Sequence, residues 1–115
     1  MPTAEGRISG DNKNFLGQWE VNGFNVLLNG NFRQSVEKWS ASPATLQYED
    51  FNDLIGTYMI DTEFEPYIGS SDLFLPFKSQ SGRHIRVVSS LQYHLSQRTD
   101  VTGLGVWQYS KSESD

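Results

Sequence analysis

Apolar and polar side chains alternate along most of the chain, in short runs that Gly, Asn, Ser and Pro separate. A period of two is typical of β-strands that bury one face. The runs predict strands at 16–21, 24–28, 32–39, 45–48, 56–61, 73–77, 83–95 and 104–109. We therefore expect an all-β protein, a small antiparallel barrel or sandwich of roughly seven to eight strands with an N-terminal meander and at most one or two short helices.

Two Asn-Gly pairs indicate where the meander turns, because both central residues of a type I′ turn need positive φ, which Gly adopts freely and Asn tolerates. A two-residue turn at Asn22-Gly23 pairs Trp19 with Val26 and keeps apolar residues on one face. That register predicts a tight hairpin between the first two strands.

The second pair, Asn29-Gly30, suits a longer loop. A two-residue turn there would place Arg33 on the apolar face, whereas a three-residue loop pairs Leu28 with Phe32. We therefore expect three loop residues, with a bulge. The two turns together predict one buried surface, made by Trp19, Val21, Phe24, Val26, Leu28, Phe32 and Val36.

Alternation is longest over 83–95, which predicts either a bent barrel strand or a strand that serves two sheets. Its apolar face carries Ile85, Val87, Leu91, Tyr93 and Leu95, and its polar face carries His84, Arg86, Ser90, Gln92 and His94. Helix has little support: 31–40 could form a short helix instead of a strand, and 48–55 could form one helical turn with Phe51, Leu54 and Ile55 inward.

The length of 115 residues and a hydrophobic content of 37% fit one domain with its own core. We expect an irregular polar arm at 1–14, in which 6–9 could form a short strand, a single β domain at 15–109 and a disordered acidic tail at 110–115. The chain has no cysteine, no signal-peptide core and no apolar run near the roughly 18 residues of a membrane span. These features predict a soluble protein without membrane insertion, located in the cytoplasm or in a virion.

Acids and bases are segregated along the chain, whose net charge is −5. No Lys or Arg falls between Trp39 and Phe77, whereas Lys78, Arg83 and Arg86 follow soon after. The two blocks either neutralise each other in the fold or make a bipolar surface. The candidate acidic patch consists of Glu49, Asp50, Asp53, Asp61, Glu63 and Glu65.

Catalytic and metal chemistry is poorly represented in the sequence. His84 and His94 would lie about 33 Å apart if they belonged to one strand, too far to share a metal. The acidic segments lack the glycine and the terminal glutamate of a calcium loop. We therefore predict no catalytic residue, no metal and no cofactor, and we expect that the protein is not an enzyme.

Three functions fit this sequence. The first is a non-catalytic interaction or assembly module, such as a subunit of a larger complex or phage particle, whose partner is another protein or a second copy. The second is a β-barrel that binds a sugar or a small apolar ligand, for which the aromatic residues would line a pocket. The third is an OB-like barrel that binds single-stranded nucleic acid, which the acidic net charge disfavours. The candidate interaction residues are Arg83, His84, Arg86, Gln92, His94, Trp107 and Tyr109.

Overall fold

The computed structural model describes residues 2–111, and within them the protein is an eight-stranded antiparallel sheet with two short 3₁₀ turns. This confirms the all-β class. The strands are β1 (Thr3–Val21), β2 (Phe24–Tyr48), β3 (Gly56–Ile60), β4 (Tyr67–Ile68), β5 (Asp72–Lys78), β6 (His84–Ser90), β7 (Thr99–Asp100) and β8 (Gly103–Lys111), and the 3₁₀ turns are Phe51–Asp53 and Thr62–Phe64.

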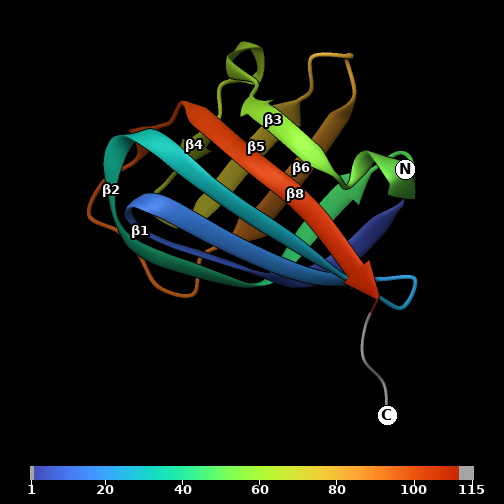
Figure 1. Ribbon diagram of the computed structural model, residues 1–115. Coiled ribbons are helices and arrows are strands. Elements are labelled where there is room, and N and C mark those ends of the chain that lie inside the picture. Colours follow the sequence, from blue (N-terminus) through green and yellow to red (C-terminus); the bar gives the residue numbers. More distant parts are fainter. Residues whose placement is uncertain (1, 112–115) are drawn as a thin grey trace.

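The sheet closes into a barrel because β2 is long enough to pair with two different strands. Its first part pairs with β8 over 24–32, and its last part pairs with β6 over 45–48. Between these partners the sheet runs from β8 to β3, β5 and β6. β1 follows β2 along its other edge, so the two strands curve together through a U (Figure 1). We call the two parts of β1, at 3–10 and 14–21, its arms.

The bend of β1 coincides with irregular pairing. Register shifts fall between Gly6 and Ile8, between Gly10 and Asn12, and between Asn12 and Asn14. Asn12 has a φ of 59°, a left-handed conformation that Asn tolerates better than most residues do. Bulges increase the local bend of a strand, so these residues let β1 turn back beside itself.

The Asn22-Gly23 hairpin is confirmed. Asn22 and Gly23 have φ values of 52° and 80°, and Trp19 lies opposite Val26. The predicted buried surface is also confirmed for every residue except Phe24, which is half-buried at the start of β2.

The predicted loop at Asn29-Gly30 is wrong, because both residues lie inside β2 and pair with β1 and β8. Leu28 therefore does not face Phe32 across a turn. Gly30 is required for packing instead: a Cβ atom there would lie 2.5 Å from Phe15 Cε2. The ring of Phe15 uses this space to stack on Phe32, with 4.5 Å between ring centroids. The short helix considered for 31–40 is also wrong, since these residues continue β2.

The irregular arm predicted for 1–14 is wrong over the described residues, because β1 begins at Thr3 and its first arm pairs with the end of β2. Residues 3–10 include few apolar side chains, so the sequence shows no strong alternation there although the segment forms a paired strand. At the other end of the chain, Ser110 and Lys111 belong to β8. Residues 112–115 of the predicted tail lie outside the described residues.

The strand predicted at 83–95 ends at Ser90. The chain then runs irregularly along the bend of β2, where neither β6 nor β8 pairs with it. Five hydrogen bonds hold this segment to residues 37–40 of β2. In three of them the Gln92 N–H donates to Ser40 O, the Tyr93 hydroxyl to Lys38 O, and the Ser96 N–H to Glu37 Oε1. On this edge, the bend of β2 is therefore hydrogen-bonded to an irregular segment, whereas β1 pairs with its other edge.

The helical turn considered for 48–55 is present as the 3₁₀ turn Phe51–Asp53. The Asp50 side chain caps it by accepting from the Asn52 N–H at 2.9 Å. Leu54 is buried as expected, whereas Ile55 is 53% exposed rather than inward.

Aromatic side chains fill the interior of the barrel. Trp19, Trp39 and Trp107 are each 1% exposed, and the rings of Trp19 and Trp107 lie 5.6 Å apart. Trp19 Nε1 donates to Ala44 O at 3.0 Å, which fixes that indole across the barrel. Because the tryptophans pack inside, any binding surface has to be sought on the outside.

Candidate functional site

The outer side of four adjacent strands includes a region without a charged side chain. The strands are β1, β2, β8 and β3, in that order across the sheet. We call this surface the uncharged face; its outward residues are Asn14, Leu16, Gln18, Leu27, Asn29, Asn31, Thr57, Met59, Leu104, Val106 and Gln108.

Strand register places these residues in three rows. The middle row runs from Leu16 through Asn29 and Val106 to Thr57, and its neighbour runs from Asn14 through Asn31 and Leu104 to Met59. Gln18, Leu27 and Gln108 form the third row. Amide and apolar side chains are therefore mixed over a continuous surface.

Several apolar side chains of this face are open to solvent. Met59 is 59% exposed, Leu16 is 52% exposed, and Leu104 and Val106 are each 41% exposed. Single exposed apolar residues are common, but contiguous ones on a strand face are typical of interaction surfaces. Charged residues, which normally make up about a quarter to a third of a surface, are missing from these rows.

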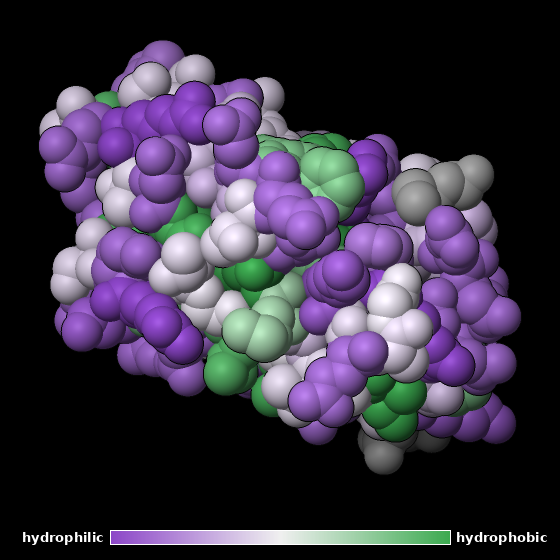
Figure 2. Space-filling view, turned by 90° about the horizontal axis from the view of Figure 1, so that it is seen from above, coloured by the Kyte–Doolittle hydropathy of each residue, from purple (hydrophilic) through white to green (hydrophobic). Residues whose placement is uncertain are grey.

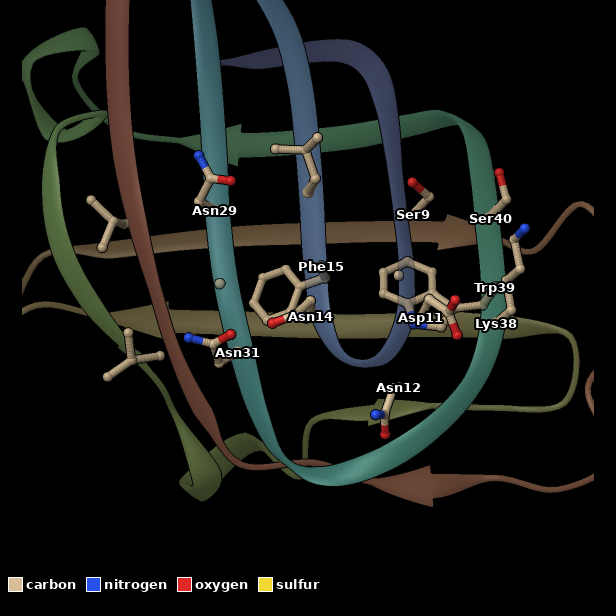
Figure 3. A pocket seen from close by; sticks show the side chains of 15 residues that line it. Ser9, Asp11, Asn12, Asn14, Phe15, Asn29, Asn31, Lys38, Trp39 and Ser40 are labelled. Atoms are coloured by element: carbon tan, nitrogen blue, oxygen red, sulfur yellow. The ribbon is translucent and has the colours of Figure 1, made fainter.

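A hollow of about 920 Å³ lies over part of the uncharged face, where Leu16, Leu104 and Val106 line it, and extends to the 3–10 arm of β1 (Figure 3). Its polar lining residues include four asparagines, one acid and one lysine. We call it the amide hollow; the polar residues that line it are Ser9, Asp11, Asn12, Asn14, Asn29, Asn31, Lys38 and Ser40. Phe15 and Trp39 also line it; in the view of Figure 3 the Phe15 ring lies between β2 and the 14–21 arm of β1, and the Trp39 ring overlaps the 3–10 arm.

Trp39 contributes an unusual group to the amide hollow. Its Nε1 atom is buried and has no hydrogen-bond partner within residues 2–111. The backbone of Gly10 lies against the indole, since a Cβ atom at Gly10 would be 2.5 Å from Trp39 Nε1. A buried donor without an acceptor costs about 1 to 3 kcal/mol.

A second hollow, of about 900 Å³, adjoins the other side of the uncharged face, between the Thr62–Phe64 turn and the loop at 79–81. Met59 and Leu104 line it together with Asp61, Glu63 and Lys78. Figure 2 looks down on this side and shows apolar residues in a depression between hydrophilic lobes. Because Leu104 lines both hollows, the uncharged face connects them.

The candidate basic residues do not form one surface. Arg83 pairs with Asp53, with 3.2 Å between Nη1 and Oδ1, and Arg86 lies 5.5 Å from the centroid of the Phe64 ring. His84 is half-buried on β6, whereas Gln92 and His94 are exposed on the irregular segment that follows β6.

The two aromatic candidates on β8 are also not free for a partner. Trp107 is buried in the core rather than exposed. Tyr109 is half-buried and packs on Phe51, with ring centroids 4.5 Å apart. Both side chains therefore stabilise the barrel.

The acidic residues also divide by environment. Asp53 and Asp61 are buried, with exposures of 8% and 7%, and each takes part in local structure. Asp61 caps the turn Thr62–Phe64 by accepting from the Glu63 N–H at 3.1 Å. The other four, Glu49, Asp50, Glu63 and Glu65, are exposed. Arg83 and Asp53 join the acidic and basic blocks of the sequence in one ion pair.

Tyr58 is hydrogen-bonded to the backbone of Asp53. Its hydroxyl donates to the Asp53 carbonyl at 2.7 Å. The pKa of Tyr58 is raised above its ordinary value, mainly because burial disfavours the phenolate and also because the Asp53 charge lies close by. This cluster fixes the 3₁₀ turn before β3 and is structural.

Sequence reasoning misses the residues of the uncharged face. Asn29 and Asn31 fit a loop when only the sequence is considered, and Leu16, Leu104 and Val106 resemble any other strand residues. The sequence does hold one signal. On β1 and β8, the alternate positions that point away from the buried tryptophans carry amides and aliphatic residues at 14, 16 and 18 and at 104, 106 and 108.

Comparisons with known proteins assign no family to this chain. No protein-family model matches it, and no curated protein matches it either. Across residues 2–111, no group of three or more His, Cys, Asp or Glu side chains is placed to hold a metal ion. The same residues contain no helix that is both long and apolar enough to cross a membrane.

Proposed function

We propose that this protein is a non-catalytic interaction module that docks a protein partner through its uncharged face. The observation that carries the proposal is the absence of charge from three consecutive rows of outward side chains that also expose Leu16, Met59, Leu104 and Val106. Burial of such a surface is favoured by the hydrophobic effect and requires no charge to be desolvated.

The surroundings of the face support docking. Lys13 precedes Asn14 on β1, Glu20 lies one outward position beyond Gln18, and Lys78 pairs with Met59. Protein interfaces commonly have a charge-depleted centre and a polar rim that remains wet. The face and its flanking charges have this arrangement.

Site-specific photo-cross-linking tests the proposal in the cells that make the protein. A benzophenone amino acid is placed at Val106, in the middle row of the face, and in a matched control at Ser90, an exposed position at the end of β6. We expect protein adducts from position 106 and few from position 90. Equal yields at the two positions, or no adduct from position 106, would contradict the proposal.

A second candidate function is the binding of a neutral sugar in the amide hollow. The observation that favours it is a hollow lined by four asparagines together with Trp39, since amide groups can both donate to and accept from the hydroxyls of a sugar. Titration with neutral oligosaccharides should then change tryptophan fluorescence in the protein and not in its Asn29→Ala, Asn31→Ala variant, whose two residues belong to both the amide hollow and the uncharged face. An unchanged spectrum across a panel of neutral glucans, mannans and galactans would exclude it.

A further inference from the structure

We infer that the second hollow, between the Thr62–Phe64 turn and the loop at 79–81, binds a small primary alkylammonium ion, whose ammonium group pairs with the Asp61 carboxylate. The alkyl chain of this ligand lies on Met59 and Leu104. The inference does not depend on the proposed function, since it requires no protein partner on the uncharged face. It accounts for the part of Asp61 that the fold leaves unused.

Asp61 is the first observation. The residue is 7% exposed, and only one of its carboxylate oxygens has a side-chain hydrogen bond within residues 2–111. Oδ1 accepts from the Glu63 N–H at 3.1 Å, whereas Oδ2 is buried and has no partner. Buried carboxylates are normally paired or fully hydrogen-bonded, because an unpartnered oxygen has lost its water without compensation. Asp61 therefore lacks a donor, and it lies in the wall of a hollow.

The charge of the hollow favours a cationic donor. Among the described residues, Arg83 pairs with Asp53 and Arg98 pairs with Asp100, and neither ion pair includes Asp61. The charged residues that line the hollow are Asp61, Glu63 and Lys78, so acids exceed bases there. Hydrogen bonds from a cation to a carboxylate are roughly twice as strong as those between neutral groups. An ammonium group is therefore favoured over a hydroxyl or an anion.

The apolar part of the wall favours an organic cation over a metal ion. Met59 is 59% exposed and Leu104 is 41% exposed, and both line the hollow. Asp61 follows β3 with an extended backbone, so its side chain lies on the same side of the chain as that of Met59, two residues earlier. Calcium needs six or more oxygen ligands. Across residues 2–111, no group of three acidic, His or Cys side chains is placed to hold a metal.

Access to Asp61 sets the strength of binding. Its free oxygen is covered, so the ammonium group has to displace a neighbouring side chain to reach it. The side chains of Thr62, Glu63 and Lys78 line the same hollow and are exposed, and exposed side chains change rotamer within nanoseconds. With one charged contact and a short apolar chain, we expect a dissociation constant on the order of 1 mM.

An NMR titration of the full chain with hexylammonium chloride at constant ionic strength tests the inference. We expect saturable shifts of backbone amide signals at 59–63 and 78–81, the segments that line the hollow. Hexanol and sodium hexanoate, which share the alkyl chain but lack the ammonium group, should bind at least about tenfold more weakly. Equal binding of hexanol, or hexylammonium shifts that fall only on other residues, would overturn the inference.

Asp61→Asn tests the role of the carboxylate. The amide oxygen can still accept from the Glu63 N–H, so the cap of the turn is kept while the charge is removed. This variant should raise the dissociation constant of hexylammonium at least about tenfold. Glu49→Gln removes the same charge at an exposed position outside the hollow and should leave the dissociation constant unchanged. Equal losses in both variants would show a general attraction to an acidic chain and would overturn the inference.

Lys78→Gln tests the sign of the charge in the hollow. Removal of the lysine should tighten hexylammonium binding by about two- to threefold, because a like charge leaves the wall. Weaker binding would mean that the lysine holds the ligand, contrary to the inference. If Asp61→Asn does not fold, as judged from the dispersion of its NMR spectrum, the comparison of hexylammonium with hexanol in the unchanged protein decides. None of these results bears on the cross-linking test at Val106.

Discussion

The ring of Phe15 occupies the space that a side chain at position 30 would need, because a Cβ atom on Gly30 would lie 2.5 Å from Phe15 Cε2. The backbone of β2 at Gly30 therefore packs against a ring from β1, the other strand of the hairpin. This contact explains why Gly30 lies in the middle of a strand, where glycine is usually unfavourable.

Gly30→Ala should therefore destabilise the protein by about 1 to 3 kcal/mol, the usual cost of overpacking a core. Urea denaturation measures the change in the free energy of unfolding. The control is a double-mutant cycle with Phe15→Ala: once the ring is gone, Gly30→Ala should cost less, and the remaining cost comes from the Leu104 carbonyl oxygen, 2.7 Å from the same Cβ position. Additive costs would show that the ring is not what excludes the side chain.

Gly23→Ala should destabilise the protein for a different reason. Gly23 has a φ of 80°, and no atom lies within 4 Å of the place that a Cβ atom would take, so only the left-handed backbone opposes a side chain. We expect a loss of about 1 to 2 kcal/mol. Removing the Phe15 ring should leave this loss unchanged, and a rescue by Phe15→Ala would contradict the role of the backbone conformation in this turn.

Tyr58 predicts a loss of stability at high pH. Its pKa is raised in the folded state, so the unfolded chain releases the phenolic proton first, near pH 10. The stabilisation is complete below that pH and is lost as pH rises through the folded-state pKa. Urea midpoints should therefore fall above pH 10 more steeply in the unchanged protein than in Tyr58→Phe.

Tyr58→Phe also tests the hydrogen bond of this group. At pH 7 the variant should lose about 1 kcal/mol, because the Asp53 carbonyl loses its donor. Parallel pH profiles for the two proteins would show that another group, such as Tyr67, whose pKa is also raised, causes the alkaline loss.

Substitutions on the uncharged face should leave the fold intact. Val106 is 41% exposed, so Val106→Lys should change the free energy of unfolding by no more than about 0.5 kcal/mol. Thermal and urea unfolding of dilute protein measure this. A large loss of stability would mean that the face supports the barrel rather than a partner.

The sequence predicts the fold correctly where local backbone preference and strand pairing agree. It fails where a residue is required by a contact with a distant segment. Asn22-Gly23 is predicted correctly because positive φ and apolar pairing agree there. Asn29-Gly30 has the same residue types, but Gly30 lies inside β2, where its missing side chain leaves room for the Phe15 ring. A packing contact with another segment cannot be recognised from the residues around Gly30. Likewise, the alternation of apolar and polar residues continues past Ser90, where β6 ends. It cannot show that the residues after Ser90 leave the sheet and hydrogen-bond to the bend of β2.

The site is less predictable than the fold. The sequence draws attention to charged residues, of which Asp53 and Arg83 pair with each other, and to Trp107, which is buried. The uncharged face arises only when β1, β2, β8 and β3 become neighbours, because each strand contributes two or three outward residues. Strand order is set by the closure of the barrel and not by any single segment.

Oxidative footprinting of the unmodified protein tests the docking role of the uncharged face most directly. Met59 lies on the face and is 59% exposed, whereas Tyr93 lies away from it and is 46% exposed. Hydroxyl radicals should oxidise Met59 several-fold more slowly in intact cells than in dilute purified protein, with Tyr93 serving as the internal reference. Protection of Met59 relative to Tyr93 is the predicted result, and an unchanged ratio between the two residues would contradict the docking role of the face.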